Sequence, residues 1–210
     1  MSDDQPLASA LVDVRRAYRL LWCYQRRVFD IVKLIVDEFD DMAFYNWRVL
    51  HSDRPCNSGT NPIGNRWAWD MLPMVNVSYL FLPSGTNPNA TLPGQWMLEV
   101  HIESDGGFED PEDGSEPDPA NFEAPEDSAS RLVIFAWYCR GETARNWYGG
   151  VWNALSWPDD DGGLIENSDP PIAVFRRNFD LATLGDRDEV RAAVASFRSS
   201  ASEALKVTLT

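Results

Sequence analysis

A hydrophobic repeat from Leu7 to Phe39 constrains the fold of this chain more than any other feature. Apolar side chains recur at alternating steps of four and three residues, with Gln25 as the exception: Leu7, Leu11, Val14, Tyr18, Leu21, Val28, Val32, Ile35 and Phe39. This spacing is typical of a helix that buries one narrow seam. Because no Gly or Pro interrupts the repeat, we expect one helix over residues 7–39, about 45 Å long.

Strand-like segments follow the expected helix. Aromatic and β-branched content predicts five strands, at 44–50, within 67–82, at 96–103, at 131–140 and at 172–179. Alternation in 96–103 predicts one buried face, Trp96, Leu98, Val100 and Ile102, and one polar face, Met97, Glu99, His101 and Glu103. Since no helical pattern separates the strands, they favour an antiparallel sheet.

The C-terminal part of the chain predicts a second helix, over 186–206. Asp186 and Glu189 form a capping pattern at its start, and apolar residues from Val190 to Leu205 share one face. We therefore predict a single α+β domain over 1–210. Its long N-terminal helix and its C-terminal helix would pack on a mostly antiparallel sheet of about five strands.

Composition indicates a globular chain that does not cross a membrane. With 44% hydrophobic residues and nine Trp, the chain can bury a substantial core, and no apolar run approaches the roughly 18–20 residues that span a bilayer. The acidic start, Met1 to Asp4, lacks the order of a signal peptide. We expect a cytoplasmic protein without a membrane partner, in which Cys23 and Cys139 are buried as small hydrophobic residues.

The negative charge of the chain is concentrated in one segment. Net charge is −15, and eleven acidic residues but no basic ones fall between Glu103 and Asp127. Four prolines lie in the same stretch: Pro111, Pro117, Pro119 and Pro125. This composition predicts a mobile acidic loop over 104–128 that joins two strands.

Three interpretations of the acidic loop stay open: a solubilising loop, a binding site for a basic protein, and an imitation of nucleic-acid phosphates. Phe108 and Phe122 would add apolar anchors. Our leading hypothesis is a non-enzymatic interaction protein, similar in role to an antitoxin, an immunity protein or an inhibitor of a nucleic-acid-processing complex. The predicted partner-binding residues are Asp105, Phe108, Glu109, Asp110, Glu112, Asp113, Glu116, Asp118 and Phe122.

The polar face of 96–103 gives the first alternative. Glu99, His101 and Glu103 recur at every second residue, and such a group can hold a divalent metal or perform acid–base chemistry. A small metal-dependent hydrolase is therefore the enzymatic hypothesis. We favour the simpler interpretation, a polar strand face that is solvated or covered by arginines. No nucleotide, phosphate or metal motif occurs, so we expect no cofactor and no metal.

The basic residues of the first helix give the remaining alternatives. Six occur within 15–33: Arg15, Arg16, Arg19, Arg26, Arg27 and Lys33. Such residues can bind the phosphates of nucleic acid, but an acidic chain repels nucleic acid at long range. We expect them to pair with the acidic loop or with Asp13, Asp30 and Asp37, and we expect no direct nucleic-acid binding. As a further alternative, the seam joins two or more chains, which predicts a self-assembling structural protein and a homo-oligomer.

Overall fold

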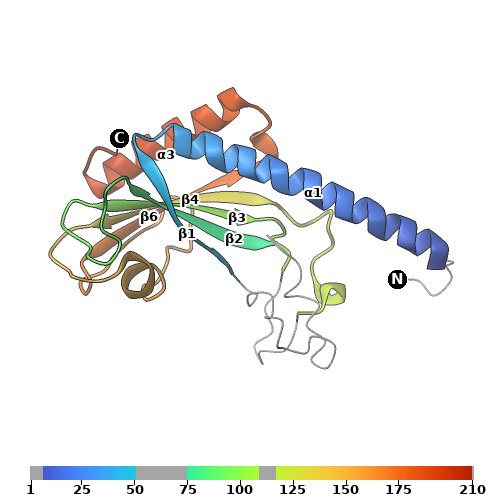
Figure 1. The fold of residues 1–210 in the computed structure, drawn as a ribbon, viewed down its shortest axis with the longest axis horizontal. Coiled ribbons are helices and arrows are strands. Elements are labelled where there is room, and N and C mark those ends of the chain that lie inside the picture. Colours follow the sequence, from blue (N-terminus) through green and yellow to red (C-terminus); the bar gives the residue numbers. More distant parts are fainter. Residues whose placement is uncertain (1–6, 51–74, 109–116, 210) are drawn as a thin grey trace.

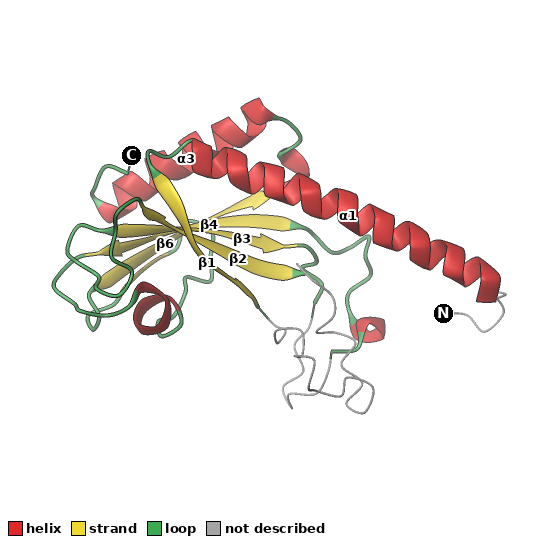
Figure 2. Ribbon diagram, in the orientation of Figure 1, coloured by secondary structure: helices red, strands yellow, loops and turns green. Residues whose placement is uncertain are grey.

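The structure, a computed structural model, describes residues 7–50, 75–108 and 117–209. Within these ranges, two long helices pack on one face of a sheet (Figures 1 and 2). The helices are α1 (Leu7–Asp37) and α3 (Arg187–Leu205), and the strands are β1 (Met42–Val49), β2 (Asn76–Pro83), β3 (Trp96–Glu103), β4 (Arg131–Cys139), β5 (Leu164–Glu166) and β6 (Ile172–Asp180). The predicted α+β class is confirmed.

The six strands form one sheet in the order β1-β2-β3-β4-β6-β5, and every neighbouring pair is antiparallel. β3 and β4 lie in the middle, and their residues are buried on both faces except near the strand ends. The sheet exceeds the predicted five strands by β5, a three-residue edge strand. Its shortness explains why composition did not reveal it.

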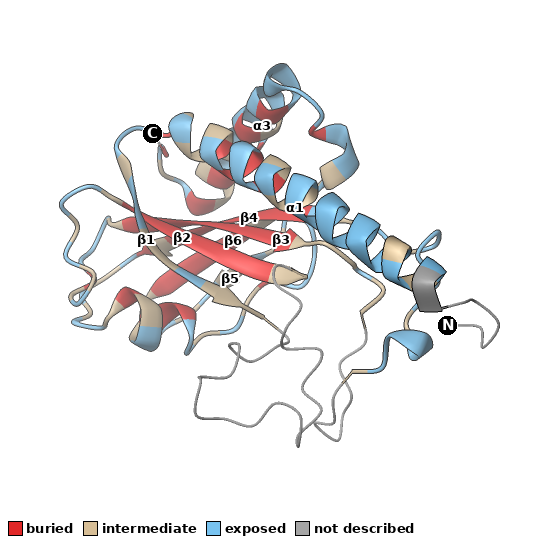
Figure 3. Cartoon of the chain, turned by 45° about the vertical axis from the view of Figure 1, so that its right-hand side comes forward, coloured by how far each residue is buried: buried red, intermediate tan, exposed pale blue. Residues whose placement is uncertain are grey.

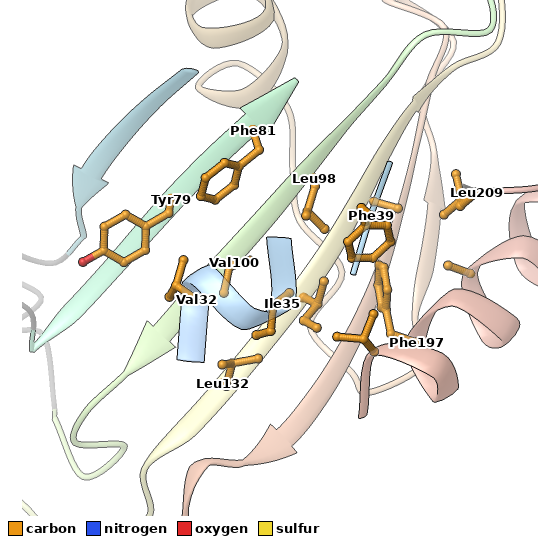
Figure 4. Close-up of a cluster of buried hydrophobic side chains, with 14 of the residues drawn as sticks. Val32, Ile35, Phe39, Tyr79, Phe81, Leu98, Val100, Leu132, Phe197 and Leu209 are labelled. Atoms are coloured by element: carbon orange, nitrogen blue, oxygen red, sulfur yellow. The ribbon is translucent and has the colours of Figure 1, made fainter. Parts of the chain in front are cut away.

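Both helices cover one face of the sheet, where the larger core lies (Figure 4). Val28, Ile35 and Phe39 come from the α1 side and Phe197 from α3, and all are at most 4% exposed. The predicted capping box of α3 is present: Asp186 accepts from the backbone N–H of Glu189, and Glu189 accepts from that of Asp186. These contacts confirm the predicted C-terminal helix.

The first half of α1 extends past the end of the sheet (Figures 1 and 3). The seam is buried from Val28 to Phe39, but Leu11 is 46% exposed and Tyr18 is 72% exposed. The prediction that the whole helix buries its seam is therefore wrong for this half. Cys23 lies in the same projecting part and is exposed, so its predicted burial is wrong, whereas Cys139 is buried as predicted.

The opposite face of the sheet is covered by aromatic side chains from one connection. A π-helical turn, η3 (Trp147–Trp152), places Trp147 and Trp152 against the sheet, and Trp157 follows it. These residues pack with Phe135 and Trp137 of β4 to form a second core. None of the helices among the described residues is long and apolar enough to cross a bilayer.

Candidate functional site

The candidate site lies on β2 and β3, on the face of the sheet opposite the two helices. Aromatic residues of 147–157 cover this face. Antiparallel pairing sets Ser78 opposite His101 and Leu80 opposite Glu99. Because side chains alternate along a strand, the three polar residues share a face with Leu80 and the second core. Strand register therefore brings a hydroxyl, a carboxyl and an imidazole together inside the protein.

The Ser78 hydroxyl joins the two titratable side chains. Its Oγ lies 2.5 Å from Glu99 Oε1 and 3.0 Å from His101 Nδ1. A hydroxyl can donate one hydrogen bond while it accepts another. With a charged Glu99, Ser78 donates to the carboxylate and accepts from the imidazole; with a protonated Glu99, the direction can reverse. Glu99, Ser78 and His101 thus form a relay along which a proton can move.

Burial controls the protonation of Glu99. The residue is 0% exposed, and loss of hydration raises the pKa of its carboxyl to about 7. Interactions with Ser78, Trp137 and Trp152 favour the charged form and offset part of that rise. Among them, Trp137 Nε1 donates to Glu99 Oε2 at 2.8 Å. The carboxyl therefore changes its charge near neutral pH, which is a property of acid–base groups.

Glu103 continues the polar chain toward the strand end. Its Oε1 lies 3.7 Å from His101 Nε2 and 4.0 Å from an Arg176 guanidinium nitrogen, and its Oε2 lies 3.5 Å from Arg131. Coverage of the strand's polar face by arginines, as the sequence suggested, therefore holds at Glu103.

A cavity of about 400 Å³ opens beside His101. Its lining is mostly polar and aromatic and comes from β2, β3, β4, β6, the residue after β1 and the connection after η3: Leu50, Asn76, His101, Glu103, Phe135, Trp157, Pro158, Asp159 and Arg176. The Trp157 ring stands edge-on to His101, with 6.1 Å between centroids. Arg176 is fixed at the wall because it donates to the Pro158 carbonyl at 2.9 Å. His101 is the member of the relay that a bound molecule would contact.

The expected polar face of β3 is wrong as a surface feature. Trp96, Leu98, Val100 and Ile102 are buried as predicted, but Met97 and Glu99 are 0% exposed and His101 is 5% exposed. The cause is the aromatic cover from 147–157, which alternation within one strand cannot reveal. A buried carboxyl and imidazole are more informative than exposed ones, because burial is costly without a partner.

The arrangement is not a nucleophile–base–acid triad. In a nucleophile–base–acid triad the carboxylate orients the imidazole, whereas here Glu99 contacts the hydroxyl. Ser78 is also 0% exposed and does not line the cavity. Within the described part of the chain, no group of three or more His, Cys, Asp or Glu side chains is placed to hold a metal ion. The geometry is suited to proton transfer through His101.

The described parts of the acidic loop have a definite shape. Asp105 Oδ1 accepts from the Ser128 hydroxyl at 2.6 Å and from the Gly107 N–H at 3.0 Å. Phe108 and Phe122 meet edge to face, with 5.4 Å between ring centroids. Asp118 caps a short 3-10 helix, η2 (Pro119–Asn121). The other predicted partner-binding residues lie outside the described residues: Glu109, Asp110, Glu112, Asp113 and Glu116.

Among the described residues, the acids of the loop form no ion pair with the basic residues of α1. Across 7–50, 75–108 and 117–209, no ion pair involves the exposed loop carboxylates, which are Asp118, Glu123, Glu126 and Asp127. Pairing of the helix arginines with nearby acids is confirmed for Arg16 with Asp13, and Lys33 pairs with Asp37. Arg27 instead donates to the Leu184 and Gly185 carbonyls. Pairing with the loop is absent from the described residues.

The sequence did not reveal Ser78 or Arg176 as site residues, nor the hydrogen bond of Trp137 to Glu99. Ser78 is one small polar residue inside an apolar strand. It lies on the same face of β2 as Leu80, but its contact with Glu99 and His101 follows only from the β2–β3 register. Trp137 was assigned to an apolar strand, where its indole N–H still requires an acceptor. Arg176 comes from β6 and reaches the cavity only because β6 lies next to β4.

These features define an α+β protein whose antiparallel sheet carries a buried acid–hydroxyl–imidazole relay. The chain belongs to the PM0109 family, since the family model described as PM0109 matches residues 4–206. A similar protein is uncharacterized protein PM0109 of Pasteurella multocida (strain Pm70). It is 26% identical over 206 residues, which cover 93% of this chain and 94% of the relative. No solved structure matches the chain.

Proposed function

We propose that this protein is a non-enzymatic interaction protein whose acidic loop, residues 104–128, holds a basic surface of a protein partner. The observation that carries this proposal is the set of exposed carboxylates at Asp118, Glu123, Glu126 and Asp127, which form no ion pair with another described residue. A carboxylate that is already in an ion pair within the protein would contribute less free energy to the binding of a basic partner. The role is that of an antitoxin, immunity protein or inhibitor, acting in the cytoplasm.

Loop geometry supports the proposal. Hydrogen bonds at Asp105 and Ser128 and the Phe108–Phe122 contact hold the two ends of the loop together. The Gly106 N–H also donates to the Ala129 carbonyl at 2.9 Å. These contacts fix the described ends of the loop, residues 104–108 and 117–128, and a surface that is fixed before binding loses less conformational entropy when a partner docks. Direct binding of nucleic acid is not part of the proposal, because a chain of net charge −15 repels it.

Two four-site variants test the loop. The loop variant carries Asp118→Asn, Glu123→Gln, Glu126→Gln and Asp127→Asn. The control variant carries Asp40→Asn, Glu142→Gln, Asp160→Asn and Glu203→Gln, which neutralise the same number of exposed acids elsewhere. Affinity capture from a lysate of the source organism should recover a basic protein with the wild type and the control, but not with the loop variant.

Salt provides the second arm of this test. Because exposed charges are screened within about 10 Å at 0.1 M salt, capture through the loop should weaken as salt rises. Capture by the loop variant at the wild-type level would contradict the proposal.

The cavity supports a second candidate function, a small enzyme that uses His101 and Glu103 for acid–base chemistry on a bound substrate. The specific observation in its favour is the Glu99–Ser78–His101 relay, which ends at the cavity wall. A metal-dependent hydrolase at these residues is tested by metal analysis of the purified protein. In cells, His101→Ala should abolish the protein's activity if the site is catalytic, and wild-type behaviour of this variant would exclude the enzyme.

A further inference from the structure

An apolar surface runs along the projecting half of α1. Its exposed seam residues are between 42% and 72% exposed: Leu11, Val14, Tyr18 and Leu21. Trp22 lies beside the seam, one turn after Tyr18, and is 58% exposed. These side chains repeat the pattern of the buried seam, but the sheet ends before it can cover them (Figure 3). They therefore form a helical contact face that no described residue covers.

This face leads into a groove between α1 and the edge strand β1. The groove has a volume of about 300 Å³ and is lined mainly by apolar residues of α1, β1 and β2, including Phe29, Val36, Phe44 and Tyr79. Phe29 and Phe44 are 51% and 61% exposed. Their rings stand edge-on to Tyr79 and Phe81 respectively, so they are held in place.

The size of this surface favours a covering partner. Together, the exposed parts of these side chains amount to several hundred Å², which is about the limit for the largest apolar patch on a monomer. If two copies buried the same patch, they would remove on the order of 1,000 Å² or more, which reaches the size of specific interfaces. The patch is therefore sufficient for a pairwise contact between two copies.

Charge identifies the partner. Arg15, Arg19 and Arg26 are exposed along α1 and form no ion pair with any described residue, while the acidic loop carries unpaired carboxylates. Both Figures 1 and 3 place η2 of that loop near the projecting half of α1. One end of the molecule thus carries an apolar helix, a basic strip and an acidic loop. A second copy would be complementary to all three, because a two-fold contact applies the same surface to itself.

We propose that a second copy of this chain covers this surface. The projecting halves of α1 pack seam to seam about a two-fold axis, and the acids of residues 117–128 in each copy face the α1 arginines of the other copy. In one respect the inference rests on the proposed function, since it uses the acidic loop as a site for a basic protein surface. Here that surface is α1 of the other copy.

Light scattering after gel filtration of the full chain tests the dimer over a range of concentrations. The wild type should have the mass of two chains. A Val14→Glu/Leu21→Glu variant should have the mass of one chain. Both sites are more than 40% exposed, so its circular dichroism should match that of the wild type. A wild type that stays monomeric at every concentration would overturn the proposal.

A charge-swap experiment tests the pairing of loop and helix. Variant A carries Arg15→Glu/Arg19→Glu, and variant B carries Glu123→Arg/Glu126→Arg. Alone, each brings like charges together, so its dimer dissociation constant should rise by about tenfold or more. Mixed in equal amounts, A and B should form a heterodimer with wild-type strength, because both loop–helix contacts regain opposite charges. A mixture no stronger than its components would reject this pairing.

Matched controls separate the two proposals. Glu142→Arg/Glu203→Arg makes the same charge change at exposed sites away from the loop and should leave the dimer intact. A monomeric wild type overturns the dimer, yet loop-dependent capture from a lysate would still support the proposed function. Conversely, equal capture by the wild type and the four-site loop variant would overturn the proposed function. The masses of the wild type and of Val14→Glu/Leu21→Glu would still test the dimer.

Discussion

At the scale of single residues, Glu99 is the most informative side chain. An unfolded chain would hydrate its carboxyl and give it an ordinary pKa near 4.5, whereas burial raises the folded value to about 7. The hydrogen bonds from Ser78 and Trp137 do not cancel this cost. Burial therefore has a larger effect than hydrogen bonding at this position, and folding becomes linked to the uptake of a proton.

We predict that stability falls as pH rises from about 4.5 to about 7. Below this window Glu99 is protonated in both states, and within it only the folded state keeps the proton. The raised pKa corresponds to about 3 kcal/mol of stability that is lost across the window. Glu99→Gln, which is neutral at every pH, should remove this slope and be the more stable protein at pH 8. Urea unfolding at about pH 4.5 and at pH 8 measures the free energy of unfolding of both proteins.

Glu123→Gln is the matched control for that experiment. This carboxyl is exposed, so its replacement should leave the pH slope of the wild type in place. If Glu99→Gln and Glu123→Gln showed the same slope as the wild type, the buried carboxyl would not be the source of the pH dependence.

Trp137→Phe tests the hydrogen bond to Glu99. Removing the indole N–H takes away an interaction that favours the charged carboxyl, so the folded pKa should move further above its present value. The loss of stability should then extend to higher pH than in the wild type. In a Glu99→Gln background the same substitution should change stability by a constant amount at every pH. A shift that persists there would assign the effect to another group.

At the scale of elements, α1 has two halves with different tasks. Val28 is 1% exposed in the half that lies on the sheet, and Val14 is 46% exposed in the projecting half. Val28→Ala should therefore cost about 1–3 kcal/mol, because it removes two buried methyl groups and leaves a cavity. Val14→Ala makes the same chemical change and should cost less than about 0.5 kcal/mol in a monomer. Urea unfolding of dilute protein compares them, and equal losses would contradict this division.

The N-terminus of α3 offers a second test at this scale. Asp186 accepts from the backbone N–H groups of Asp188 and Glu189. Asp186→Ala leaves these donors unpaired and should reduce the free energy of unfolding by about 0.5–2 kcal/mol. Asp186→Asn retains an acceptor oxygen and should restore most of that loss. If both variants were equally destabilised, the carboxylate charge would matter more than the cap.

At the scale of the whole molecule, charge opposes folding. With a net charge of −15 and a cluster of exposed acids on one loop, the folded chain repels itself, and salt screens this repulsion. The melting temperature should rise when salt increases from about 0.02 M to about 0.2 M. The four-site loop variant should gain less, and the four-site control variant reports the effect of total charge alone. A melting temperature that falls with salt would contradict this prediction.

The sequence by itself determined both long helices, every strand of the described sheet except β5, and the class of the fold. Helix and strand periodicities, and the capping pattern at Asp186, are local, so they placed α1, β3 and α3 before any contact was known. Tertiary structure decided which faces were covered. A helix of 31 residues is about 46 Å long, whereas strands of eight or nine residues span about 30 Å, so part of the seam had to project. Likewise, Ser78 met Glu99 and His101 only through strand register, and the aromatic cover buried them, because contacts between distant segments are not encoded in the pattern of either one.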